Sequence, residues 1–149
     1  MRRHLQPEEL GDFFDQPINA ILAFRRRDGS LVQRPVWHRW EDDHLEFQIP
    51  AGDRKITMLE RDPRVQVIVS ENEYPYRTLE VRGHATLSSD RYHERAREIV
   101  ARYVAAYDPG RPLEAYLSLE PGAIVEIHAE HIVGWDYADD VLHGASSLP

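Results

Sequence analysis

Residues 77–87, RTLEVRGHATL, alternate apolar and polar side chains along the whole stretch. A period of two is the pattern of a β-strand that buries one face and exposes the other. Gly83 falls on the apolar face, where it predicts a bulge, a bend or a close approach of another backbone segment. Such a strand needs a sheet around it, so this stretch constrains the fold strongly. Its apolar face is formed by Leu79, Val81, Ala85 and Leu87.

The rest of the chain supplies further strands and short helices. Asp28-Gly29 provides the positive φ of a tight turn, which predicts that residues 18–40 form two strands joined as a hairpin. More strands are predicted at residues 44–50, 64–71 and 122–135, and helices at 7–14, 54–61 and 90–107, with a helical turn at 112–119. Hairpin-linked strands with inserted helices favour a mainly β fold, an antiparallel barrel of about six to seven strands with flanking helices.

Length and composition limit the class of protein. The 149 residues favour a single domain, residues 1–149, with an N-terminal helix inside 1–14 and a flexible tail at 143–149. The lack of cysteine excludes disulfides and thiolate metal sites and suits a cytoplasmic protein. A formal net charge of −8 argues against nucleic-acid binding. No apolar run approaches the roughly 20 residues that span a bilayer, so no membrane association is expected.

Residues 51–65, AGDRKITMLERDPRV, carry two cations where a helix usually has acids. Asp53 has the position of an N-cap, and Arg54 and Lys55 follow it. A helix N-terminus carries partial positive charge, so the pair costs an isolated helix ~0.3–1 kcal/mol. The same N–H groups attract anions, and arginine and lysine beside them suit a phosphate or carboxylate. The pair indicates either an anion site or two solvated cations.

Two other stretches place aromatic and charged residues where a ligand could reach them. In QRPVWHRW, Pro35 cannot donate a ladder hydrogen bond and belongs at a sheet edge, a bulge or a split. Trp37 and Trp40 fall on opposite strand faces, so one should leave the core and either be covered by a helix or second subunit or line a ligand site. In ENEYPYRTLEV, Tyr76 and Arg77 either pack in a loop or present a stacking, charged edge to a ligand.

The sequence contains no motif of covalent or metal-assisted catalysis. The P-loop, HExxH and GxSxG patterns are missing from it. His128 and His131 are three apart in a predicted strand, which points them to opposite faces and prevents them from sharing a metal ion unless the strand has a bulge. We therefore expect no metal site and name no catalytic residue.

The order of these motifs resembles that of a known superfamily. Residues 29–87 contain Pro35-Val36-Trp37, the Arg54-Lys55 helix start, an Arg-Asp-Pro-Arg-Val helix exit at 61–65 and Val-Arg-Gly at 81–83. In this order they resemble the flavin and deazaflavin oxidoreductases of the pyridoxamine 5'-phosphate oxidase-like superfamily. The resemblance implies an FMN-binding split β-barrel that forms a homodimer, with the cofactor in a cleft between the subunits and a small molecule as the substrate.

The resemblance also implies roles for individual residues. Lys55, helped by Arg54, would hold the cofactor phosphate. Tyr76 and Arg77 would approach the site at the dimer interface. One strand segment would lie along the isoalloxazine or deazaflavin ring, and it consists of Arg34, Pro35, Val36 and Trp37.

Departures from the family pattern favour F420, a deazaflavin, over FMN. Ile49 and Pro50 stand where flavin members often carry Thr-Asn, which removes side-chain hydrogen bonds from the usual FMN site. Asp53 replaces a serine and would repel a phosphate unless it caps the helix and points away. F420 has a long acidic tail, for which the arginines at 25–27 would supply extra charge if they border the cleft; otherwise they form a solvated strand end.

These features lead to a functional hypothesis with two rivals. The protein is expected to transfer a hydride between F420, or FMN, and a small organic acceptor. Trp135 lacks the paired arginine of true pyridoxamine phosphate oxidases, so vitamin B6 oxidation is not expected. The first rival is a non-catalytic carrier that holds a flavin, a haem or another tetrapyrrole in the same cleft. The second is a dimeric scaffold with a vestigial site.

Overall fold

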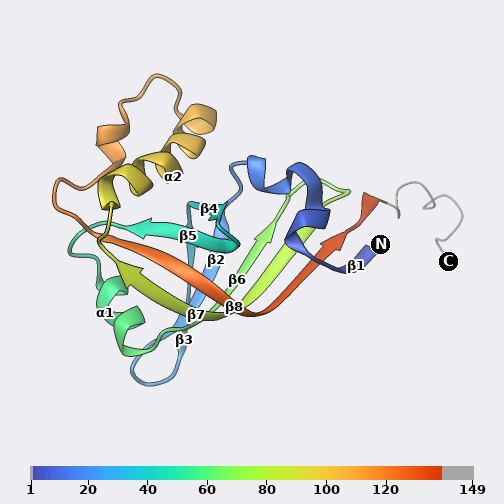
Figure 1. Ribbon diagram of the computed structural model, residues 1–149, viewed down its shortest axis with the longest axis horizontal. Coiled ribbons are helices and arrows are strands. Elements are labelled where there is room, and N and C mark those ends of the chain that lie inside the picture. Colours follow the sequence, from blue (N-terminus) through green and yellow to red (C-terminus); the bar gives the residue numbers. More distant parts are fainter. Residues whose placement is uncertain (1, 139–149) are drawn as a thin grey trace, which may run out of the picture.

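The computed structural model describes residues 2–138, and the tail predicted to be flexible, 143–149, lies outside them. The described chain forms a curled sheet with helical segments around it (Figure 1). The helical segments are η1 (Pro7–Asp15), α1 (Arg54–Arg61), α2 (Tyr92–Tyr107) and η2 (Leu113–Tyr116), of which η1 and η2 are 3₁₀ helices. The strands are β1 (Arg2–Leu5), β2 (Ala20–Arg25), β3 (Leu31–Val36), β4 (His38–Glu41), β5 (His44–Ile49), β6 (Arg64–Ser70), β7 (Arg77–Ser88) and β8 (Ala123–Asp136).

The strands follow the order β3-β2-β6-β7-β8-β5-β4, and β1 adds to β8. All of these pairs are antiparallel. Although β3 and β4 are consecutive in the chain, they lie at the two ends of this order. The one-residue link at Trp37 therefore carries the chain from one end of the sheet to the other, and the sheet curls into a split barrel. The predicted mainly β, antiparallel split-barrel fold is confirmed.

The core lies on the apolar face that the alternation at residues 77–87 predicts. Leu79, Val81 and Ala85 are buried there, and Leu87 is partly buried against them. Large side chains from other strands and from α1 fill the same space, among them Leu22, Phe47, Ile49 and Leu59. Burying one such side chain contributes about 1.5–3 kcal/mol. The packing of this face thus holds β2, β5 and α1 at fixed positions around the barrel.

Gly83 sits beside a bulge in β8. Arg82 pairs with His131 but Gly83 pairs with Ala129, so Glu130 is an extra residue in the ladder. A Cβ on Gly83 would lie 1.9 Å from the carbonyl oxygen of His128, which confirms the predicted close approach. The bulge also corrects the expectation that His128 and His131 face opposite sides. They pair with His84 and Arg82, which are two residues apart in β7 and therefore share a face.

Three local features differ from the sequence-based expectation. β1 was not predicted, because its four residues have no clear period and are held by pairing with β8. The predicted strand at 31–40 is broken at Trp37, where its two halves part to pair with β2 and β5. The predicted helix at 7–14 is the 3₁₀ segment η1, which kinks at Gly11, where φ is 62°. In each case the distant pairing or packing decides the local structure.

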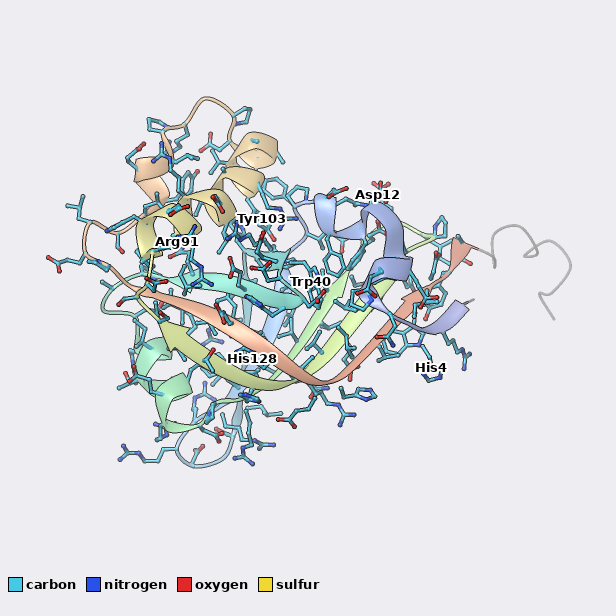
Figure 2. All side chains as sticks on the ribbon, viewed as in Figure 1. His4, Asp12, Trp40, Arg91, Tyr103 and His128 are labelled. Atoms are coloured by element: carbon cyan, nitrogen blue, oxygen red, sulfur yellow. The ribbon has the colours of Figure 1, made fainter. Side chains whose placement is uncertain are left out.

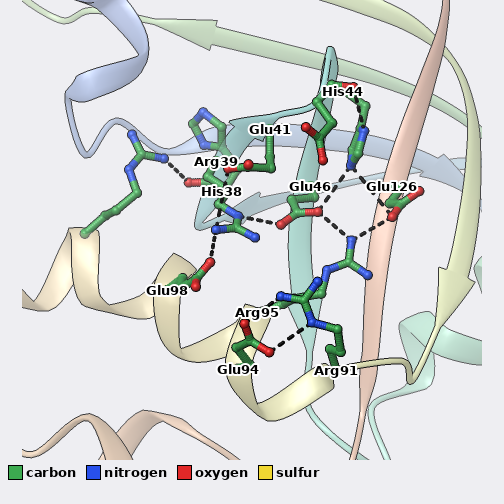
Figure 3. A network of polar contacts seen from close by, with 12 residues as sticks. His38, Arg39, Glu41, His44, Glu46, Arg91, Glu94, Arg95, Glu98 and Glu126 are labelled. Atoms are coloured by element: carbon green, nitrogen blue, oxygen red, sulfur yellow. Dashed lines mark hydrogen bonds and ion pairs between the residues drawn. The ribbon is translucent and has the colours of Figure 1, made fainter.

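A network of charges fixes α2 to the outside of the barrel (Figure 3). Glu46 on β5 is almost fully buried and accepts hydrogen bonds from Arg39 and from Arg95 on α2. Burial opposes ionisation of Glu46, but these guanidinium donors outweigh it and lower the pKa of the carboxyl. Arg95 also donates to Glu126 on β8, at 2.6 Å. The helix is thereby tied to both β5 and β8.

The corner between β3 and β4 is clamped by Tyr103 of α2, which points from the helix to the barrel (Figure 2). The Tyr103 hydroxyl donates to the carbonyl of Ile18 at 2.7 Å, accepts from the His38 backbone N–H at 3.0 Å, and lies 2.9 Å from His38 Nδ1. Its single proton goes to Ile18, so we infer that neutral His38 donates from Nδ1. Burial, followed by the nearby charge of Arg102, lowers the pKa of His38 to about 3.

The two tryptophans of this corner both find aromatic partners. The indole of Trp37 stacks on Tyr103, with ring centroids 4.9 Å apart and an interplanar angle of 5°. Trp40 stacks on Phe14 of η1 at 5.0 Å. Trp37 is therefore covered by a helix, which is one of the alternatives that the sequence left open.

Candidate functional site

The N-terminus of α1 and the turn end of the β2–β3 hairpin enclose a cavity of about 380 Å³, which we call the basic pocket. Phe24, Val32 and Met58 form its apolar floor. The charged side chains that line it within residues 2–138 are Arg26, Arg27, Arg34, Arg54, Lys55, Arg61 and Asp53. Six cations against one carboxylate produce a strong positive potential. The structure therefore brings the predicted Arg34, Arg54 and Lys55 together in one anion-binding cavity.

Asp53 caps the helix that carries the two cations. Its Oδ1 accepts the backbone N–H of Lys55 at 2.8 Å, and its Oδ2 accepts the Lys55 ammonium, also at 2.8 Å. Partial burial opposes the ionisation of Asp53, but the bonds from Lys55 prevail and lower the pKa of the carboxyl. The acid at this position is thus the N-cap, and it neutralises Lys55 within the pocket.

The arginines of the basic pocket are not neutralised in this way. Among residues 2–138, none of these five guanidiniums lies within ion-pair distance of a carboxylate. Those that form hydrogen bonds use neutral acceptors: Arg34 donates to the carbonyl of Gln33, and Arg61 donates to that of Arg25. Like charges that outnumber their counter-charges repel one another. An arrangement of this kind is stabilised when an anion enters.

The other residues predicted at the cofactor site lie on β3, at the corner after it, and at the end of β5. Pro35 is exposed and opposite Ile21 in the sheet, whereas Val36 points into the core. The side chain of Trp37 is engaged with Tyr103. Ile49 is fully buried, and Pro50 is exposed just before α1. Within one chain, therefore, the exposed members of this group are Arg34, Pro35 and Pro50.

Tyr76 and Arg77 lie beside a second and larger cavity of about 860 Å³, which we call the acidic cleft. It opens between residues 16–21 and 68–77. Arg77 donates to both carboxylate oxygens of Glu71, to Asp12 and to the carbonyl of Leu10. The hydrogen bond with Glu71 is the largest influence that raises the pKa of Arg77. Tyr76 packs on Tyr137, with ring centroids 4.6 Å apart.

The basic pocket and the acidic cleft lie on opposite faces of the sheet near its edge strand, β3. Arg34 lines the basic pocket and is opposite the buried Leu22, whereas the next residue, Pro35, is opposite Ile21, which lines the acidic cleft on the outer face. One chain does not bring Tyr76 and Arg77 to the basic pocket. Their predicted approach to the cofactor requires a second subunit, and it stays a prediction.

A group of possible metal ligands occurs under α2. His44, Glu46 and Glu126 hold ligand-type atoms within 4.8 Å of one another. The Arg95 guanidinium donates to both carboxylates at 2.6 Å and supplies the cation between them. This group therefore belongs to the network that anchors α2.

Several residues that line the two cavities were not foreseen from the sequence. Arg61 reaches the basic pocket from the last turn of α1, one face of which is buried in the core. Ile21 and Ile68 lie on the outer face of the sheet with 36% and 42% of their surface exposed. Apolar residues at outward positions of two adjacent strands are a signal that could have found this surface.

Fold and pocket together define a class of protein: an antiparallel split barrel with a cation-lined cavity at a helix N-terminus. The chain belongs to the pyridoxamine 5'-phosphate oxidase family, whose model matches residues 6–136. The superfamily resemblance noted in the sequence is thereby confirmed. No curated protein matches the sequence significantly. Within residues 2–138, no helix is both long and apolar enough to cross a bilayer.

Solved structures share the fold at low sequence identity. A conserved hypothetical protein from Mycobacterium tuberculosis is similar with a TM-score of 0.68 and 20% identity, over 90% of this chain and 86% of that one. An F420 reductase has a TM-score of 0.64 and 22% identity, over 81% and 93%. An FAD-binding protein from Mesorhizobium loti has a TM-score of 0.63 and 22% identity, over 89% and 95%. At these identities the likeness shows the fold.

Proposed function

We propose that the protein is an oxidoreductase that transfers a hydride between F420, or alternatively FMN, and a small organic acceptor. The observation that carries this proposal is the basic pocket, with its five arginines that lack carboxylate partners within residues 2–138. Membership of the pyridoxamine 5'-phosphate oxidase family and the likeness to an F420 reductase support it.

The donor set of the basic pocket fits a cofactor phosphate. Arg34, Arg54 and Lys55 come from two different elements and line one cavity, and the N–H groups at the start of α1 add partial positive charge. Arginine forks and a lysine ammonium suit phosphate oxygens. Asp53 weakens the site by holding Lys55, so Arg34 and Arg54 are expected to be the principal phosphate ligands.

F420 is favoured over FMN because the cationic surface is larger than one phosphate requires. Arg26, Arg27 and Arg61 extend the basic pocket beyond the start of α1. An acidic tail would neutralise them. When bound, the cofactor supplies the two-electron chemistry, while the protein supplies binding, orientation and electrostatics.

A homodimer is part of the proposal. Ile21 and Ile68, which are opposite each other on β2 and β6, expose 36% and 42% of their surface on the outer sheet face, and Tyr74 and Tyr107 stand exposed near them. Apolar side chains grouped around a cleft suit contact with a second copy of the chain. The ring would lie along Pro35 and the backbone of Val36 and Trp37, and the partner's copies of Tyr76 and Arg77 would approach it there.

Titration and rapid kinetics test this proposal. Purified protein is titrated with F420 and, separately, with FMN, and fluorescence quenching of each cofactor is followed. We expect micromolar or tighter binding, with F420 preferred. Stopped-flow oxidation of the bound reduced cofactor by quinone and enone acceptors then measures turnover. Failure to bind either cofactor would overturn the proposal, and a bound but unreactive cofactor would instead establish a carrier.

A further inference from the structure

We propose that the acidic cleft is the acceptor site, and that it selects planar acceptors that are cationic or neutral over anionic ones. The assignment to an acceptor rests on the proposed function, in which Ile21, Ile68, Tyr74 and Tyr107 also face the second copy of the chain, so that the acceptor would lie between the subunits. The preference for cationic or neutral molecules over anionic ones rests on the charges that line the cleft, and it can be tested without a cofactor.

The shape and lining of the cleft suit a flat organic molecule. Its volume of about 860 Å³ is within the range of small-molecule sites. Ile18, Ile21 and Ile68 contribute apolar lining, and Tyr74 and Tyr107 contribute aromatic rings. Tyr107 is fixed at its far end, because its hydroxyl donates to the carbonyl of Pro17. Aromatic faces attract flat rings and cations.

The charges of the cleft are predominantly negative. The exposed or partly buried carboxylates that line it are Glu71 and Glu73, and the cation among its lining residues within 2–138 is Arg77. Arg77 is shared between Glu71 and Asp12, so these three groups together keep one negative charge. Glu73 is exposed and forms no ion pair with any residue from 2 to 138. An anionic acceptor would meet repulsion here, whereas a cation would be attracted.

The positions of the two cavities suit an anionic cofactor end in the basic pocket and an acceptor in the acidic cleft. Arg34 and Pro35 point to opposite faces of the edge strand β3, so the two cavities lie on either side of this edge. A cofactor whose anionic end lies in the basic pocket would pass around this edge to reach the cleft. The negative cleft would repel the acidic tail and so favour one orientation of the cofactor. The same potential disfavours haem and bile pigments, which carry two carboxylates.

Three phenazines with one ring system and different charges provide the test. Protein without added cofactor is titrated at pH 7.5 with N-methylphenazinium, phenazine and phenazine-1-carboxylate, and Kd is measured by quenching of protein fluorescence. We expect the cation to bind at least tenfold more tightly than the carboxylate, with phenazine between them. Glu73→Gln should lower this ratio about threefold. Glu120→Gln, which removes an exposed carboxylate outside the cleft, should leave it unchanged.

The outcomes separate this inference from the proposed function. Equal binding of the three phenazines, tightest binding of the carboxylate, or no effect of Glu73→Gln would overturn the charge preference, even if F420 binds. Conversely, the charge preference would stand if neither F420 nor FMN binds, and the proposed function would then fail. In the loaded protein, N-methylphenazinium takes up both electrons and the hydrogen of the hydride and becomes a neutral dihydro compound. Its reduction should be faster than that of phenazine-1-carboxylate.

Discussion

The basic pocket and the acidic cleft are both lined by charged side chains, but the arginine of the cleft is paired with carboxylates and the arginines of the pocket are not, within residues 2–138. In the cleft, Arg77 is held by Glu71, Asp12 and the carbonyl of Leu10, so its charge stabilises the surrounding loop and η1. In the pocket, Arg54 and its neighbouring arginines have no carboxylate partner among residues 2–138. Paired charges serve the fold, whereas gathered like charges cost stability and indicate a ligand. Lys55 combines the two cases, because it lines the basic pocket but forms an ion pair with Asp53.

Acid should destabilise the folded protein, because His38 is buried as a neutral side chain at the corner between β3 and β4. Folded His38 has a pKa of about 3, against 6.5 as the ordinary value, so the unfolded chain binds the extra proton as pH falls below 6.5. The contribution of His38 to the free energy of unfolding should therefore fall by about 1.4 kcal/mol for each pH unit between 6.5 and 3.5. Urea unfolding at several pH values measures this slope. His38→Gln should flatten it by that amount, and an unchanged slope in this variant would contradict the assignment.

Removing both cations at the start of α1 should affect the basic pocket alone. The double variant Arg54→Ala/Lys55→Ala loses the charge-assisted contact of Arg54 to an anion, of the order of 1.5–3 kcal/mol, and leaves the Asp53 carboxylate without Lys55, so that it repels the anion. We expect Kd for the cofactor to rise at least tenfold, while the cation-to-anion ratio of the acidic cleft stays the same. Arg97→Ala is the matched control, because Arg97 is exposed and paired with Glu114. If both variants bind the cofactor equally, the phosphate does not lie at α1.

Arg77→Met should change the cleft without changing the pocket. It leaves Glu71 without its guanidinium and the Leu10 carbonyl without its donor, so we expect a loss of about 2–3 kcal/mol in unfolding free energy. It also makes the cleft more negative, and N-methylphenazinium should then bind several-fold more tightly. Arg97→Met should cost less than about 0.5 kcal/mol. Weaker binding of the cation by a folded Arg77→Met protein would count against the electrostatic account.

Asp53→Asn should have the smallest effect. Asparagine caps a helix about as well as aspartate, so stability should change little, whereas Asp53→Ala should cost about 0.5–2 kcal/mol. Freed from the carboxylate, Lys55 becomes available to an anion, and cofactor binding should tighten about three- to tenfold. Thermal unfolding and fluorescence titration of the two variants separate the cap from the charge. Weaker cofactor binding in Asp53→Asn would mean that the carboxylate takes part in the site.

Local pattern was sufficient for much of the fold and for one half of the site. The alternation at 77–87 located the core face, and the cap and cations at 53–55 located the basic pocket, because both depend on neighbours in the chain. The break at Trp37, the bulge at Glu130 and strand β1 depend on which strands pair across the barrel. Arg61 and the apolar pair Ile21 and Ile68 acquire their surroundings only when α1 and the sheet are in place.

A crystal structure of the protein with F420 would test the central claim most directly. The account predicts the cofactor phosphate within hydrogen-bond distance of Arg34 or Arg54 in the basic pocket, with the ring system directed around the edge strand β3 towards Ile21. A phosphate bound in the acidic cleft, beside Arg77 or Tyr76 of the same chain, would contradict it.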